Sequence, residues 1–78
     1  MGEQEIYAKL DEVFQDVFDD DSIHVDAATT ADDIEDWDSL MHITLIAAVE
    51  DEFGVHFSMG EVSTMKNVGE MVDLIMSR

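Results

Sequence analysis

The stretch Trp37-Asp38-Ser39-Leu40 divides the sequence into two parts of different character. The residues just before it are mostly acidic, whereas the residues after it are mostly apolar and recur at helical spacing. Asp38 is a favourable N-cap residue, so we predict that a helix begins here. Ser39 then lies beside backbone N–H groups that have no partner within the helix, where a phosphate is favoured by roughly 0.3–1 kcal/mol. This position suits a covalent attachment point better than a catalytic centre.

Two longer helices are predicted from apolar spacing. The helix that begins at Asp38 runs to Phe53, because Gly54 readily adopts the positive φ that ends helices. We expect its buried stripe to consist of Leu40, Ile43, Ile46, Ala47, Val49 and Phe53, widened by Leu45 and Ala48. Residues 3–18 form an earlier amphipathic helix, whose apolar positions are Ile6, Leu10, Val13, Phe14 and Val17.

Capping patterns predict two more helices near the C-terminal end of the sequence. Ser58 and Glu61 have the reciprocal spacing of a capping box, which predicts a short helix. Asn67 and Glu70 repeat this pattern before a last helix that runs nearly to Arg78. The apolar positions of this last helix are Val68, Met71, Val72 and Ile75.

Residues 19–37 form a long connection in which the sequence predicts no helix. Loops of this length are usually functional or held down by their own apolar residues. Ile23, Val25 and Ile34 are the candidates for this role, and Trp37 is expected to pack the end of the loop on the helices. The predicted fold is therefore all-α: a small four-helix bundle with a long loop between the first and second helices and a short third helix.

Composition limits the function. The 78 residues suit a single domain, and they include no cysteine for disulfides or thiolate zinc sites. The formal net charge of −17 argues against nucleic-acid and anionic-membrane partners and favours proteins with basic surfaces. No stretch approaches membrane-spanning length, and residues 1–5 lack the cationic and apolar segments of a signal peptide. We expect a cytoplasmic monomer.

Three motifs together resemble the acyl carrier proteins, the phosphopantetheine-dependent carrier family. They are the Asp38-Ser39-Leu40 sequence, the Glu50-Asp51-Glu52-Phe53-Gly54-Val55 sequence and the Asn67-Val68-Gly69-Glu70-Met71-Val72 sequence. The resemblance covers nearly all of residues 1–78, which would form one carrier domain. It implies that a phosphopantetheinyl transferase attaches 4′-phosphopantetheine from coenzyme A to Ser39, and that the thiol of this arm holds an acyl group as a thioester. Acyl-loading, acyl-transferring or condensing enzymes with basic surfaces are the other implied partners.

We assign partner recognition to residues around Ser39 and on the helix that follows it: Asp38, Leu40, Met41, Thr44 and Glu50. Carriers of bulk fatty-acid synthesis commonly have acidic residues just after the serine, where this chain has Met41, His42 and Thr44. Trp37 similarly replaces a small residue. These differences favour a specialised pathway, such as secondary metabolite, polyketide, surface polysaccharide or lipid modification chemistry.

Other interpretations of the same residues lead to different functions. Ser39 and His42 are three residues apart, as a nucleophile and a base on one helical face would be. However, a chain of this size lacks room for an orienting acid and an oxyanion hole, so we predict no catalytic residues and expect His42 to face solvent, like His24 and His56. The acidic clusters lack the ligand spacing of an EF-hand, so no metal site is predicted. The alternative function is an acidic protein-interaction module that docks through its second helix without a prosthetic group.

Overall fold

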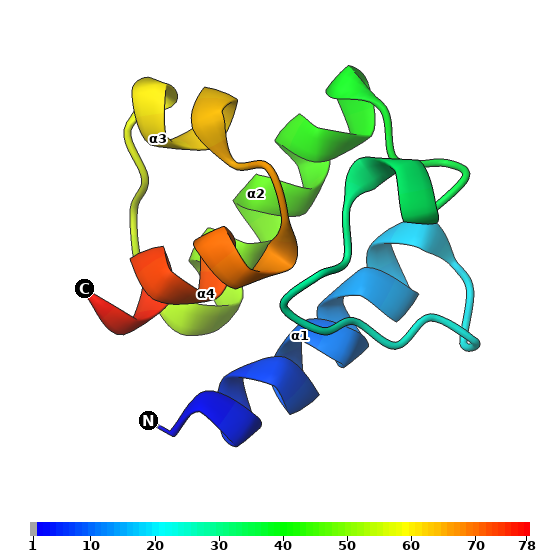
Figure 1. The fold of residues 1–78 in the computed structure, drawn as a ribbon, viewed down its shortest axis with the longest axis horizontal. Coiled ribbons are helices and arrows are strands. Elements are labelled where there is room, and N and C mark those ends of the chain that lie inside the picture. The colour runs from blue at the N-terminus through cyan, green and yellow to red at the C-terminus, as the bar shows by residue number, and fades with distance from the viewer. Residues whose placement is uncertain (1) are drawn as a thin grey trace.

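The computed structural model describes residues 2–78, and the elements of this part of the chain are helical (Figure 1). They are α1 (Glu3–Phe18), a short 3₁₀ helix η1 (Ala31–Asp33), α2 (Ser39–Phe53), α3 (Met59–Thr64) and α4 (Val68–Met76). This confirms the all-α four-helix fold with a long first loop and a short third helix. The predicted N-caps at Asp38, Ser58 and Asn67 are also confirmed, because each side chain accepts a backbone N–H of its own helix.

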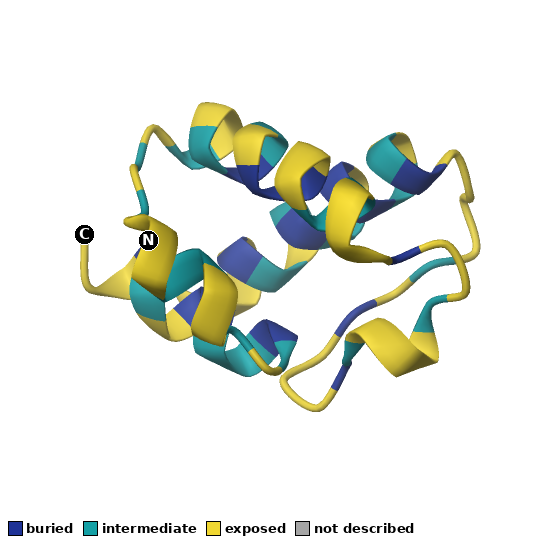
Figure 2. Ribbon diagram, turned by 90° about the horizontal axis from the view of Figure 1, so that it is seen from above, coloured by how far each residue is buried: buried dark blue, intermediate teal, exposed yellow. Residues whose placement is uncertain are grey.

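The core lies between α1, α2 and α4, whose inner sides are buried (Figure 2). All four predicted apolar positions of α4 are buried, as are the first four of α1. Val17 is only half-buried, because it lies with Ala48 at the open groove between α1 and α2. Phe18 is buried in addition.

The predicted buried stripe of α2 was wrong for its N-terminal half. Leu40 and Ile43 are 74% and 66% exposed, and Ala47 is exposed as well. The predicted burial of Leu45, Ile46 and Val49 is confirmed, while Ala48 and Phe53 pack at the edge of the core. Helical periodicity could not distinguish the two sides, because residues 39–49 contain no Asp, Glu, Lys or Arg.

Side chains of α1 hold the first part of the long loop. The carboxylate of Asp11 accepts the Val25 N–H at 2.7 Å, and the Gln15 amide donates to the Ile23 carbonyl at 2.8 Å. Val25 is buried, whereas Ile23 and Ile34 are half-buried against the core, so all three predicted residues do anchor the loop. The prediction that nothing helical occurs before Asp38 was wrong, because η1 forms one short turn within the loop.

The loop is also bonded to the start of α4. The N–H groups of Val68 and Gly69 donate to the carbonyls of Thr29 and Ala27 at 2.9 and 3.1 Å. A Cβ atom at Gly69 would lie 3.0 Å from the Ala27 carbonyl oxygen, so this close approach favours glycine. The predicted anchor Trp37 is buried, and its ring meets Phe14 edge-on at 5.3 Å between centroids. These contacts fix Trp37, two residues before the start of α2, and therefore place Ser39 at a defined position.

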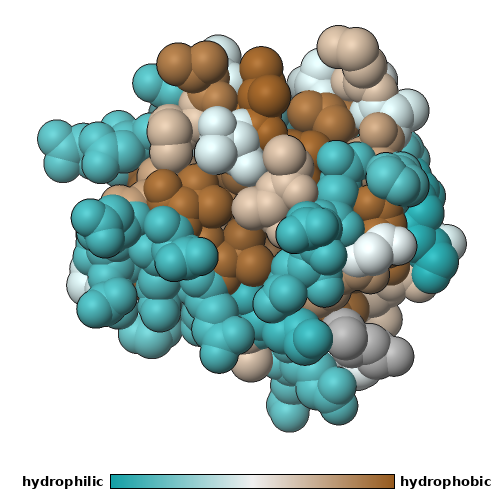
Figure 3. Space-filling model, turned by 180° about the vertical axis from the view of Figure 1, so that it is seen from behind, coloured by the Kyte–Doolittle hydropathy of each residue, from teal (hydrophilic) through white to brown (hydrophobic). Residues whose placement is uncertain are grey.

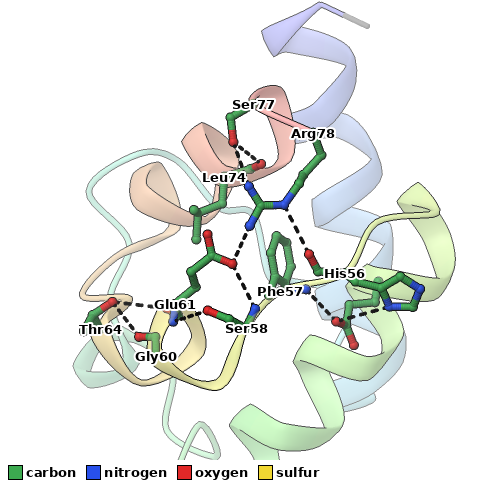
Figure 4. Close-up of polar contacts among 10 residues, drawn as sticks. His56, Phe57, Ser58, Gly60, Glu61, Thr64, Leu74, Ser77 and Arg78 are labelled. Carbon is green, nitrogen blue, oxygen red and sulfur yellow. Dashed lines mark hydrogen bonds and ion pairs between the residues drawn. The ribbon is translucent and has the colours of Figure 1, made fainter.

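The short helix α3 has no buried residue and is held at its N-terminal end by Arg78 (Figure 4). The Arg78 guanidinium donates to the Glu61 carboxylate and to the His56 carbonyl and lies over the Phe57 ring. Glu61 also completes the capping box with Ser58. The hydrogen bonds from Arg78 and Ser58 hold the pKa of Glu61 below its usual range.

Hydrophilic side chains cover much of the surface, but apolar side chains gather on the face seen in Figure 3. Among residues 2–78, the large apolar residues that the surface exposes are Leu40, Ile43, Met59 and Met76. Within residues 2–78, no helix has the length and apolar character needed to cross a membrane.

Candidate functional site

Ser39 is exposed and is the first residue of α2. The preceding Asp38 has extended backbone, and its carboxylate accepts the Met41 N–H at 2.8 Å. The Asp38 carbonyl accepts the N–H of His42, also at 2.8 Å. The N–H groups of Ser39 and Leu40 have no partner within the helix, as is general for a first turn. A phosphate on the Ser39 oxygen would therefore lie at the positive end of the α2 dipole.

A pocket of about 530 Å³ opens beside Ser39. It lies between the start of α2, the end of the long loop, α3 and the α3–α4 connection. Its apolar walls come from Ala31, Trp37, Val62, Met65 and Met71, and its polar walls from Asp38, His42, Ser63, Lys66 and Asn67. The pocket thus joins an exposed hydroxyl to a partly apolar recess that reaches the buried Met71.

His42 is not the solvent-facing residue predicted from the sequence. It is half-buried and forms a bridge between two elements that are far apart in sequence. Its Nδ1 accepts the Trp37 indole N–H at 3.1 Å, and its Nε2 lies 3.2 Å from the Val62 carbonyl oxygen in α3. We call these three groups the His42 bridge. The prediction failed because helical spacing places His42 on α2 without showing that Trp37 and α3 cover it.

The His42 bridge leaves no ring nitrogen to activate Ser39. The indole N–H can only donate, so Nδ1 must be the acceptor, and Nε2 then carries the hydrogen that it donates to Val62. A general base needs an unoccupied basic nitrogen within reach of the proton it removes. The geometry therefore gives no support to a nucleophile–base pair at Ser39 and His42.

The residues predicted for partner recognition do not all lie together in the structure. Asp38, Leu40 and Thr44 are exposed near the start of α2, whereas Met41 is half-buried against the core. Glu50 lies three turns from the start of α2, roughly 16 Å along the helix axis. Its carboxylate accepts the Phe57 N–H at 2.9 Å and lies 3.8 Å from the exposed His56 ring.

Residues of α3 and the α3–α4 connection complete the site, and sequence reasoning did not assign them to it. They are Val62, Ser63, Met65, Lys66 and Asn67. Asn67 was found only as a helix cap, a role that it also has. No motif connects these positions to Ser39, because they follow it by more than twenty residues and meet it only through the packing of α3.

Comparison with known proteins agrees with this geometry. The family model described as "Phosphopantetheine attachment site" matches residues 8–75. The chain is 32% identical over 77 residues to an acyl carrier protein of Lactobacillus acidophilus, covering 99% of this chain and 96% of that protein. It is also 32% identical over 75 residues to an acyl carrier protein of Acidothermus cellulolyticus, covering 96% and 89%.

A solved structure gives the same result. The solution structure of a holo acyl carrier protein from Geobacter metallireducens has a TM-score of 0.85 and 42% sequence identity, and the match covers 91% of this chain and 82% of that one. The carrier family is thus shown both by sequence and by fold, and it holds its cargo for other enzymes rather than acting as a catalyst. The chain belongs to the phosphopantetheine-attachment family of acyl carrier proteins, and phosphopantetheine is its covalent cofactor.

Proposed function

We propose that Ser39 is the residue that carries phosphopantetheine, and that residues 1–78 form one carrier domain for a specialised biosynthetic pathway. The observation that carries the assignment is an exposed serine at the start of α2, directly beside a pocket of about 530 Å³. When bound, the prosthetic group supplies a thiol that holds an acyl group as a thioester.

The residues around Ser39 fit such a group. The free N–H groups of the first α2 turn favour the phosphate, and the Asp38 cap keeps this turn formed. Val62, Met65 and Met71 offer apolar contacts to the arm or its cargo, while Ser63 and Asn67 offer hydrogen bonds. Ser39 supplies the ester oxygen, and the other residues position and shelter the group.

The outer side of α2 supports a particular mode of partner docking. Leu40 and Ile43 are largely exposed next to Ser39, and Thr44 and Ala47 continue this uncharged surface. Acidic residues lie at its two ends, with Asp36 and Asp38 before α2 and Asp51 near its C-terminus. A partner would therefore place apolar side chains over the centre and basic side chains around it. The basic residues steer the approach, and the apolar contact determines the lifetime of the complex.

These features support a proposal for the partners and the pathway. We infer that the partners are a phosphopantetheinyl transferase and acyl-loading, acyl-transferring or condensing enzymes. The uncharged start of α2, together with Trp37 and His42, favours lipid modification, polyketide or related chemistry over bulk fatty-acid synthesis. The cytoplasmic location and monomeric state expected from the sequence stay predictions.

A mass measurement tests the attachment. The purified chain is incubated with coenzyme A, Mg²⁺ and a transferase of broad specificity. We expect the mass to rise by one phosphopantetheine per chain, and no increase in Ser39→Ala. The matched control is Ser63→Ala, because Ser63 is also exposed and lines the same pocket. Modification of Ser39→Ala would assign the attachment to another residue.

The interaction-module alternative has a separate outcome. If wild type takes up no phosphopantetheine but still binds a protein through Leu40 and Ile43, the attachment assignment is wrong and the docking surface remains.

A further inference from the structure

We propose that His42 is a positioning residue of the Ser39 pocket, and that uptake of one proton by His42 releases α3 from the side of this pocket. The proposal explains why Trp37 and His42 occur together, because each supplies one partner of the same hydrogen bond. The idea that this pocket receives a prosthetic group rests on the proposed function, but the His42 bridge exists in the unmodified chain.

The bridge requires a neutral imidazole. Nδ1 accepts the indole N–H at 3.1 Å, and the planes of the two rings are 28° apart. Protonation of Nδ1 would place two N–H donors against each other, and neither can accept. The Trp37 hydrogen bond is then lost, and the imidazole must turn away from a half-buried position where its Nε2 also contacts the Val62 carbonyl.

The packing around His42 explains why loss of the Trp37–His42 hydrogen bond would affect α3. Trp37 is fixed on its other side by Phe14 and Phe18 of α1, so the indole cannot follow a moving imidazole. In contrast, α3 has no fully buried residue, and its Val62 packs half-buried against the core. Arg78 holds α3 through Glu61, and His42 is bonded to the next residue, Val62. Breaking the bridge therefore removes one of the few contacts that keep α3 at the side of the pocket.

No single sign of charge surrounds His42. The charged side chains that line the pocket with His42 are Asp38, at the start of α2, and Lys66, in the α3–α4 connection. They are of opposite sign. The groups of α1 that pack on Trp37 are the uncharged rings of Phe14 and Phe18. Trp37 is thus the contact that needs an unprotonated Nδ1, because its N–H can only donate, whereas the Val62 carbonyl accepts the Nε2–H.

Trp37 is the one tryptophan among the 78 residues, so its fluorescence reports the bridge directly. We would titrate the unmodified chain from about pH 8 to about pH 5, the range in which an imidazole takes up a proton. Wild type is expected to change its emission in a single one-proton step. His42→Gln should lose this step, because the amide can accept from Trp37 and donate to Val62 without titrating. His56→Gln is the matched control and should titrate like wild type.

A second measurement separates positioning from general stability. In His42→Ala, hydrogen exchange of the α3 amides should be roughly fivefold faster than in wild type at neutral pH, and His42→Gln should restore slow exchange. The ¹⁵N shifts of the wild-type ring should show the Nε2–H tautomer, a test that needs no variant. The opposite tautomer, a flat wild-type titration, or an unchanged titration in His42→Gln would each overturn the proposal.

The outcome is independent of the attachment site. Ser39→Ala should show the same fluorescence step as wild type, so failure of phosphopantetheine attachment leaves the bridge intact. Conversely, a missing step leaves the mass test of Ser39 unaffected.

Discussion

The two sides of α2 carry similar aliphatic residues but differ in how far these residues are buried. Leu45, Ile46 and Val49 are buried against α1 and α4, whereas Leu40 and Ile43 on the other side are largely exposed. Burial of an aliphatic side chain contributes to folding, but the same side chain in water contributes almost nothing to folding. The exposed aliphatic residues are therefore available for recognition. One helix thus supplies both the core of the domain and the surface beside Ser39.

The largest expected effect is on the inner side. Leu45→Ala should lower the free energy of unfolding by about 2–5 kcal/mol, because Leu45 is fully buried and its loss leaves a cavity. The core of so small a domain supplies only about 3–5 kcal/mol, so this variant should lose a large part of its stability or all of it. Leu40→Ala is the matched control and should stay within about 0.5 kcal/mol of wild type in urea unfolding. Equal effects for both leucines would remove the distinction between the two sides.

A charge on the outer side should affect recognition without affecting folding. We expect Ile43→Asp to raise the KM of a phosphopantetheinyl transferase for this carrier at least about fivefold, because it places a desolvated carboxylate in an apolar contact. Ala8→Asp on the exposed surface of α1 adds the same charge elsewhere and should change KM little. If both variants behave alike, net charge rather than the α2 surface governs docking.

The N-cap residue Asp38 stabilises the start of α2, which both sides of the helix share. Asp38→Ala should destabilise the domain by about 1 kcal/mol, because the Met41 N–H loses its acceptor. Asp38→Asn can still accept this hydrogen bond and should recover most of the stability in the same urea experiment. A loss of modification in Asp38→Asn, despite normal stability, would assign the carboxylate a direct role in partner recognition.

The smallest expected effect concerns α3, which contributes no buried residue to the core between α1, α2 and α4. The pKa of Glu61 is lowered by Arg78 and Ser58, so its carboxylate stabilises the fold above the ordinary glutamate pKa. This contribution is lost as the pH falls from that ordinary value through the lower folded pKa. We therefore expect Glu61→Gln to lower the thermal midpoint slightly at neutral pH and to match wild type in acid. A difference of the same size in acid and at neutral pH would contradict this assignment.

Local signals in the sequence were sufficient for much of the fold. Asp38, Ser58 and Asn67 mark helix starts because a side-chain oxygen a few residues from an N–H needs no distant partner. The amphipathic face of α1 could be predicted because charged residues alternate with apolar ones. Trp37 was identified as an anchor because a large aromatic ring gains most from burial. The family resemblance also depended on local motifs around Ser39.

Tertiary structure decided the features for which local signals were ambiguous or absent. The side of α2 that enters the core depends on where α1 and α4 lie, because residues 39–49 carry no Asp, Glu, Lys or Arg that would mark a solvent-facing side. The bonds of His42 likewise depend on α3 packing across the start of α2. The sequence by itself thus determined the helices, their caps and the position of Ser39 at a helix start. Only the packed structure decided which apolar residues stay exposed and that an imidazole connects Trp37 to α3, because both depend on contacts between distant segments.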